Sequence, residues 1–319
     1  TATVSRCLNN PERVQKTTRM RVLQAVESLG YTPNFSARAL SARRTDTIGA
    51  VIPTMDNAIF SRGLQAFQEA LHEEGRTLLV ATSQFDPDVE AEQISTLVAR
   101  GAEGLLLIGH DRAAETTQTL LRRRIPTIVA WAYDANAALP CVGFDNRGAM
   151  RALAQAALER GHRDIAIISA ETRRNDRARD RVAGVKAAIA EFGPSAQLTA
   201  VIETQYTIDG GATAFNAALR SDVRPTVVMC GNDVRAVGAI QQAKRLGLSV
   251  PRDVSITGFD DIELAALVEP TLATVHVPHR RMGRRAAEEL LQNIQTGGEG
   301  SRIEITADLR LRASLGPAR

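Results

Sequence analysis

The chain has 319 residues, 44% of them hydrophobic and 24% charged, which is enough for two or more globular units. No apolar run approaches a membrane span, and no secretory signal precedes the first motif, so we expect a cytoplasmic protein. The net charge is +3, but residues 1–46 hold eight Lys or Arg and three acids, so this end is +5 and the remainder is −2. Solvated helix faces can produce such a bias, but a basic head on a near-neutral body indicates an anionic polymer as partner.

The cysteines and histidines predict no metal site and no cofactor. Cys7, Cys141 and Cys230 are far apart and in no ligand spacing, so we interpret them as free thiols. His276 and His279 straddle a proline, with no cysteine or acidic pair at ligand spacing.

The chain begins with two predicted short helices. Val4 and Leu8 share a helical face, and residues 9–11 (Asn-Asn-Pro) end that helix. Thr17 or Thr18 would cap the second helix, and Gly30 follows its end. Its apolar stripe consists of Val22, Leu23, Val26 and Leu29. Because the outer faces are basic and polar, the pair resembles the second half of a helix-turn-helix head. The first residues read as the middle of a motif, so we expect further residues upstream.

Residues 31–44 combine a turn signal, small residues and arginines with one large apolar side chain, Leu40. A helix here would have no wide apolar face and would be marginal alone. The stretch fits an exposed linker as well as a segment that orders against a phosphate backbone.

From residue 47 the pattern alternates between strands and helices, which predicts doubly wound parallel sheets. Strands are expected at 47–53, 77–82, 104–108, 126–131, 165–169, 200–203, 226–230 and 254–258, with helices at 60–75, 88–100, 113–124, 147–160, 178–192, 210–219 and 234–246. Two such units facing one another form a cleft, which is the default ligand site.

Polar and aromatic residues follow the ends of these strands, in the pattern of a binding site. They are Asp56, Asn57, Ile59, Phe60, Asp145, Asn146, the segment 173–181, Tyr206, Asn232, Asp233 and Asp260. Aromatic rings stack on sugars or bases, carboxylates and amides accept from hydroxyls, and arginine binds anions. Taken singly, Asp56, Asn146 and Asp233 also fit as helix caps.

Catalytic motifs are missing from the sequence. It has no G-x-G-x-x-G after a strand, no P-loop and no G-x-S-x-G elbow. Asp260 and Asp261 are adjacent at a strand end but have no identifiable partner acid or base. We therefore predict a binding protein and not an enzyme.

The motifs resemble the lactose/purine repressor family of bacterial transcription regulators across essentially the whole chain. The matching segments are residues 3–9, 29–34, 39–40, 161–165, 177–184, 232–238, 255–261, 270–275 and 282–283. The resemblance implies a head and hinge at 1–46 (hinge about 34–44). It also implies a first sensor subdomain at 47–159 with 279–305, and a second at 160–278 with 306–319.

For the head, the resemblance implies a recognition helix in the major groove and a hinge leucine, Leu40, wedged into the minor groove. The implied DNA-binding residues are Thr1, Ala2, Ser5, Arg6, Asn34, Arg38 and Leu40. The family's first head helix has no counterpart here. A homodimer on a pseudo-palindromic operator is expected, and no heptad-like tail follows Leu311 to suggest a tetramer.

For the cleft, the resemblance implies a small-molecule effector, a sugar or a purine. The implied effector-binding residues are Ile59, Phe60, Asp145, Arg177, Arg181, Tyr206, Asn232 and Asp260. Arg177 departs from the small hydroxyl residue often found there and joins Arg173, Arg174 and Arg179 in a basic loop. This loop predicts an effector with a carboxylate or phosphate, such as a sugar acid or sugar phosphate, unless the arginines lie on the solvent side of the helix at 178–192. The alternative function is a periplasmic-type sugar-binding transport protein, for which the basic head would have no use.

Overall fold

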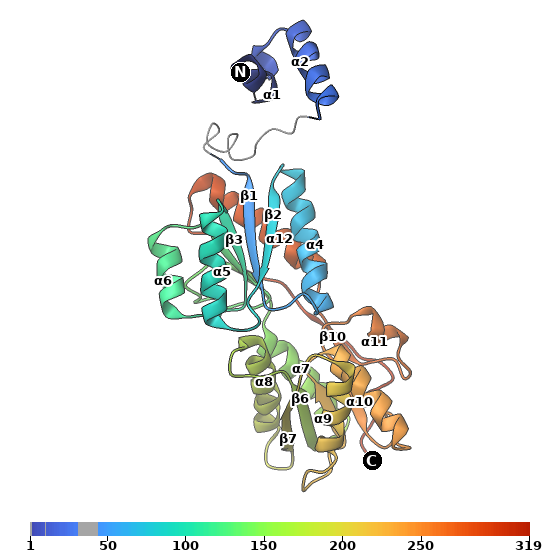
Figure 1. Ribbon diagram of the computed structural model, residues 1–319. Coiled ribbons are helices and arrows are strands. Elements are labelled where there is room, and N and C mark those ends of the chain that lie inside the picture. Colours follow the sequence, from blue (N-terminus) through green and yellow to red (C-terminus); the bar gives the residue numbers. More distant parts are fainter. Residues whose placement is uncertain (1, 10, 31–43) are drawn as a thin grey trace.

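The computed structural model describes residues 2–9, 11–30 and 44–319, and in it the chain from β1 onward forms two α/β lobes stacked end to end (Figure 1). The first lobe is built on a six-stranded parallel sheet in the order β11-β5-β4-β3-β1-β2. The second lobe has a four-stranded parallel sheet in the order β7-β6-β8-β9. The prediction of two doubly wound parallel-sheet subdomains is confirmed.

The elements of the first lobe alternate up to β5, and the last two come from the far end of the chain. They are β1 (Thr47–Ile52), α4 (Ala58–Glu73), β2 (Thr77–Thr82), α5 (Pro87–Ala99), β3 (Gly104–Ile108), α6 (Ala114–Arg122), β4 (Thr127–Ala130), β5 (Cys141–Gly143), α12 (His279–Thr296) and β11 (Arg302–Glu304).

Each central strand of this lobe is apolar on both sides, as a sheet covered by helices on both faces requires. In β3, Leu106 and Ile108 join the core under α4 and α12, whereas Leu105 and Leu107 join the core under α5 and α6. Two-residue periodicity thus divides one short strand between two cores.

The second lobe repeats this design. It contains α7 (Asn146–Glu159), β6 (Asp164–Ser169), α8 (Asp176–Phe192), β7 (Gln197–Glu203), α9 (Ile208–Ala218), β8 (Val227–Cys230), α10 (Asp233–Arg245), β9 (Ser255–Thr257) and α11 (Glu263–Leu267). An antiparallel pair, β10 (Thr274–His276) with β12 (Asp308–Arg310), lies next to it. In β6, Ile165 and Ile167 face one core while Ala166 and Ile168 face the other.

The chain passes between the lobes three times, near residues 144, 277 and 306. Helix α7 packs against α8 and beside β10 and β12, on the second lobe. The sequence-based division had placed this helix in the first subdomain, with the boundary after residue 159. Because α7 packs on the second lobe, we propose the first boundary near Phe144 instead. The sequence did not indicate this boundary, since the loop after β5 is too short to mark a change of domain.

Helix α12 was not predicted from the sequence, although it has 18 residues. Its stripe of Met282, Ala286 and Leu290 is fully buried against the sheet and α4. The two helices can approach closely because Gly283 has no side chain. A Cβ at this position would lie 2.0 Å from the carbonyl oxygen of Gly63. No helix in the described ranges has the length and apolar character needed to cross a membrane.

The head consists of α1 (Ala2–Asn9), η1 (Pro11–Arg13) and α2 (Lys16–Ser28). Helix α2 begins after Gln15 without a side-chain cap, so the predicted caps Thr17 and Thr18 are wrong and both lie in its first turn. Gly30 follows the helix with φ +57°, as predicted. Of the predicted stripe, Val22, Val26 and Leu29 line a groove beside α1, whereas Leu23 lies outside it.

Candidate functional site

A cavity of about 820 Å³ lies between the two lobes, at the carboxyl ends of strands from both sheets. Seven of the predicted effector residues line it: Ile59, Phe60, Arg177, Arg181, Tyr206, Asn232 and Asp260. The two parallel sheets therefore bring residues that are up to 200 positions apart in the chain to one site. Their position at one cavity supports the predicted set.

Asp145 is not among the lining residues. Its exposed carboxylate caps α7 by accepting from the amide of Gly148 at 2.9 Å. The next residue, Asn146, is buried behind the lining and contacts Arg181, which does line the cavity. The predicted effector contact at Asp145 is thus better explained as a helix cap.

The predicted caps were each one residue off. Asn57 rather than Asp56 caps α4, and Asn232 rather than Asp233 caps α10. Asn232 has two roles, since its Oδ1 accepts from the amide of Arg235 while the residue also lines the cavity. The cap and ligand interpretations are therefore compatible at that position.

Five buried residues form a closed ring of contacts, of which Arg181 and Asp260 also line the cavity. Asn146 Nδ2 donates to the carbonyl of Trp131 (3.0 Å), and Asn146 Oδ1 accepts from Arg181 Nε (3.0 Å). Asp260 Oδ1 lies 3.7 Å from Arg181 Nη2 and 4.0 Å from His279 Nε2. The ring closes where Trp131 Nε1 donates to His279 Nδ1 at 3.2 Å. Trp131 and His279 belong to the first lobe and Arg181 and Asp260 to the second, so this ring joins the lobes.

Two atoms in this ring remain without a hydrogen bond. Asp260 Oδ1 and His279 Nε2 are both buried and unsatisfied. A buried unpaired polar atom is costly. For Asp260, which lines the cavity, a ligand hydroxyl would supply the missing partner. Burial raises the pKa of Asp260 to about 6, although Arg181 and Arg235 oppose that shift.

Aromatic and apolar surfaces complete the cavity. Phe60 lies edge-on to Trp131, with ring centroids 5.5 Å apart, and so connects the cavity lining to the buried ring of contacts. Tyr206 lines the opposite side, and its hydroxyl is buried without a partner. Rings facing hydrogen-bonding groups suit a ligand with apolar faces and polar edges.

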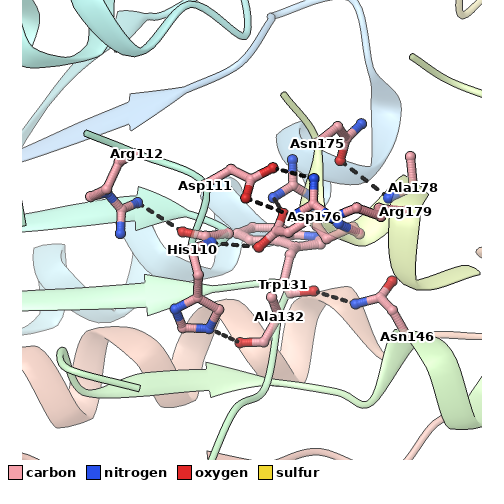
Figure 2. A network of polar contacts seen from close by, with 12 residues as sticks. His110, Asp111, Arg112, Trp131, Ala132, Asn146, Asn175, Asp176, Ala178 and Arg179 are labelled. Carbon is pink, nitrogen blue, oxygen red and sulfur yellow. Dashed lines mark hydrogen bonds and ion pairs between the residues drawn. The ribbon is translucent and has the colours of Figure 1, made fainter. Parts of the chain in front are cut away.

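The basic loop 173–181 is largely neutralised by carboxylates of the protein, two of which, Asp86 and Asp111, lie on the first lobe. Figure 2 shows Asp111 beside Arg179. Arg179 makes a bidentate contact with Asp111 at 2.7 and 2.9 Å. Arg174 binds Asp86 at 2.6 Å. The loop thus holds the lobes together, and its charge alone does not indicate an anionic effector.

Asp176 and Arg177 complete this junction. Asp176 accepts from the backbone amide of His110 on the first lobe and pairs with Arg177 at 2.7 Å. Burial alone would raise the pKa of Asp176, but Arg177 and that amide hold it below its usual value. Gly109 makes the approach possible, since it has φ +70° and a Cβ there would lie 1.7 Å from Arg177 Nη1.

Several site residues were missed from the sequence. Arg235 lies within one of the family-like motifs, three positions after Asn232, so helical spacing could have placed both on one face. Phe85 and Gln205 follow β2 and β7 and could have been found by the strand-end rule. Trp131 and His279 gave no sequence signal, because their role depends on a contact between distant elements.

The DNA-binding predictions fall in the head. Ala2, Ser5 and Arg6 belong to α1, and Arg6 is exposed. Thr1, Asn34, Arg38 and Leu40, together with the predicted hinge helix, lie outside the described residues.

The cysteines and acidic residues indicate no inorganic centre in the described ranges. Cys7, Cys141 and Cys230 are buried free thiols. Residues 2–9, 11–30 and 44–319 hold no group of three His, Cys, Asp or Glu side chains that could bind a metal ion. His276 pairs with Asp261 through Nδ1 at 2.9 Å.

Two lobes around a ligand-sized cleft, with a head of short helices, define a ligand-responsive DNA-binding regulator. Residues 45–313 match the model of periplasmic binding proteins and the sugar binding domain of the LacI family. Residues 1–34 match the model of bacterial regulatory proteins of the lacI family. The chain belongs to the LacI family, and it is a transcription regulator, not an enzyme or a transport protein.

Individual relatives agree with this assignment. The chain is 32% identical to the ribose operon repressor of Haemophilus influenzae over 315 residues, covering 97% of this chain and 94% of the relative. It is 29% identical to catabolite control protein A of Priestia megaterium over 282 residues, covering 88% and 85% of the two chains. A LacI-family regulator from Silicibacter pomeroyi has the same fold, with a TM-score of 0.90 at 25% identity, covering 99% and 95%.

Proposed function

We propose that this protein is a cytoplasmic repressor that binds a sugar-like effector in the cleft and, as a homodimer, a pseudo-palindromic operator. The observation that carries the effector class is the cavity itself. Phe60 and Tyr206 offer ring faces, while Asn232, Arg181 and the unsatisfied Asp260 offer hydrogen-bonding groups. The sugar binding domain model that covers the cleft and the ribose operon repressor among the relatives support this class.

Ile59, Phe60, Arg177, Arg181, Tyr206, Asn232 and Asp260 are the proposed effector residues. Asp260 would accept from ligand hydroxyls and Arg181 would donate to ligand oxygens. Because the cavity takes lining from both lobes, a ligand that contacts both would favour their closed arrangement. That shift would reach the head through the first lobe, from which the hinge segment leads to residues 1–30.

For the head we propose base contacts from α1, with Arg6 donating to a guanine in the major groove. Asn34, Arg38 and Leu40 would serve the minor groove, as the resemblance implies. Dimerisation would present two such heads to two half-sites.

The test is a gel-shift titration of the dimer on DNA upstream of its own gene, with salt varied. We expect a sequence-preferring complex at moderate salt that a cleft ligand strengthens or weakens. Equal binding to a scrambled duplex of the same length would contradict the proposal. The sign of the ligand's effect distinguishes an inducer from a corepressor.

A further inference from the structure

Arg235 differs from every other arginine of the cleft. Five arginines line the cavity: Arg173, Arg174, Arg177, Arg181 and Arg235. The first four lie within 4.0 Å of a carboxylate, namely Glu171, Asp86, Asp176 and Asp260 respectively. Within the described part of the chain, Arg235 has no carboxylate at that distance, although only 3% of its surface is exposed.

The backbone holds the Arg235 guanidinium but leaves part of it unpaired. Nε donates to the carbonyl of Gln205 at 3.1 Å, and Nη2 donates to the carbonyl of Thr204 at 2.9 Å. Nη1 donates to no group in residues 44–319. The guanidinium carbon also lies 5.7 Å from the ring centroid of Tyr206. These contacts fix the side chain, so little conformational entropy would be lost on binding.

The buried charges of the cavity wall leave one positive charge uncompensated. Arg177 pairs with Asp176, and Arg181 pairs with Asp260, whereas Arg235 forms a close ion pair with neither and feels the charge of Asp260 only at longer range. The other nearby buried carboxyl, Asp233, bonds to Ile262 N and Thr274 Oγ1 and does not line the cavity. A buried cation without a counter-ion is costly, and a bound anion removes that cost.

The helix that carries Arg235 adds to this potential. Asn232 caps α10, and Gly231, Asn232 and Arg235 line the cavity at its amino end. The first turn of a 13-residue helix carries partial positive charge, which favours a negative group beside it.

We propose that the effector is a polyhydroxylated monocarboxylate, a sugar acid, whose carboxylate binds Arg235 while its hydroxyls meet Asp260 and Arg181. The inference rests on the proposed function and specifies the ligand of the same cleft. The single uncompensated charge fits one carboxylate, and the 820 Å³ cavity has room for a sugar-sized molecule around it.

The experiment compares matched neutral and acidic sugars on the full chain. D-gluconate, D-glucuronate and D-galacturonate are screened against D-glucose and D-galactose by thermal shift, and positive compounds are measured by calorimetry. We expect at least one acid to raise the unfolding temperature more than its neutral counterpart. If no acid does so, the proposal is overturned.

Variants then assign the effect to Arg235. Arg235→Met should weaken acid binding by about 30-fold or more, because it removes one partner of a buried charge pair. Arg235→Lys keeps the charge and should recover part of that loss. Arg173→Met is the matched control, since Arg173 is also at the cavity but is exposed and paired with Glu171. The unfolding temperature of each unliganded variant reports whether it folds.

The possible outcomes distinguish a failure of the sugar-acid proposal from a failure of the proposed function. If Arg235→Met weakens acids and neutral sugars equally, the residue only holds the loop at Thr204 and Gln205, and the proposal fails. If neutral sugars bind and change operator affinity while acids do not bind, the sugar acid is wrong and the proposed function stands. If neither class binds or affects operator binding, both fail.

Discussion

Trp131 fixes the proton of His279. The indole N–H can only donate, so Nδ1 of His279, 3.2 Å away, must be the acceptor. The proton of the neutral ring is therefore on Nε2, the nitrogen 4.0 Å from Asp260 Oδ1. Protonating the ring would place a second N–H against the indole donor. The pair thus keeps His279 neutral and presents a donor to the carboxylate at the cavity floor.

This arrangement predicts how His279 changes stability with pH. Burial, with Arg181 nearby, lowers the pKa of His279 from 6.5 to about 3. Between these values the unfolded chain binds more protons than the folded chain, so this residue makes the free energy of unfolding rise with pH up to 6.5. The difference between the wild type and His279→Gln should therefore increase from pH 3 to 6.5 in urea titrations.

Asp260 must be separated from this effect because its slope has the opposite sign. Its pKa is about 6 in the folded protein and 3.8 as its ordinary value, so between these the folded state binds more protons. Its contribution to stability falls as pH rises through that window. Asp260→Asn serves as the comparison variant. Parallel pH curves for the wild type and His279→Gln would contradict the neutral state assigned to the buried His279 ring.

The ion pairs across the cleft predict a second result. Arg174 and Arg179 of the second lobe bind Asp86 and Asp111 of the first. Being partly exposed, each pair is worth about 0.2–1 kcal/mol. Arg174→Gln/Arg179→Gln should therefore change global stability little but favour separation of the lobes. We expect a larger radius of gyration by small-angle X-ray scattering of the ligand-free protein.

Arg151 offers a matched control for this experiment. It pairs with Glu191 at 2.9 Å, but both residues lie on the second lobe, on α7 and α8. Arg151→Gln removes an ion pair of similar exposure that cannot affect lobe separation. A radius that changes equally in both variants, or in neither, would show that the cross-lobe pairs do not hold the cleft.

These relationships show what the sequence could and could not predict. The strand-helix alternation placed most elements up to Gly258 because each strand was a short aliphatic run between helical stripes. The three-residue strands β5, β10, β11 and β12 were missed, since such segments have no period of their own. Helix α12 was missed because its many arginines obscured the stripe.

Site residues could be predicted from the sequence where they directly follow a predicted strand. Asn232 and Asp260 follow strand ends, and parallel strands bring such residues together. The contact between Trp131 and His279 depends on two crossings between the lobes, near residues 144 and 277, which local patterns do not encode. The sequence also could not predict that the charge of the basic loop is neutralised, because its carboxylate partners Asp86 and Asp111 lie on the other lobe.

A third prediction concerns the packing of α4 on α12. A Cβ at position 283 would lie 2.0 Å from the carbonyl oxygen and 2.7 Å from the carbonyl carbon of Gly63. Because these are backbone atoms, the helices must move apart. Gly283→Ala should destabilise the protein by about 1–3 kcal/mol or more in urea unfolding.

Gly298 provides the control for this substitution. It is exposed just beyond α12, and a Cβ there would meet only Thr296 Oγ1, at 3.2 Å. Gly298→Ala should change stability by less than about 0.5 kcal/mol. If the two variants unfold at the same urea concentration, the close approach of α4 and α12 is not a constraint on the fold.

The fourth prediction tests the head through Arg6. This arginine is exposed on α1, where the proposed recognition helix would meet base edges. Arg6→Ala should reduce affinity for the operator by about 1–3 kcal/mol, because a bidentate contact to guanine discriminates among bases by that amount. Affinity for a scrambled duplex should fall much less. Fluorescence anisotropy at several salt concentrations measures both.

Arg13 supplies the comparison within the same head. It is also exposed but belongs to η1, outside the proposed recognition helix. If it meets DNA at all, it would meet phosphates, so Arg13→Ala should weaken both duplexes alike and make the salt dependence shallower. If Arg6→Ala behaves in the same way, Arg6 contacts the backbone, and base recognition must come from other residues of the head.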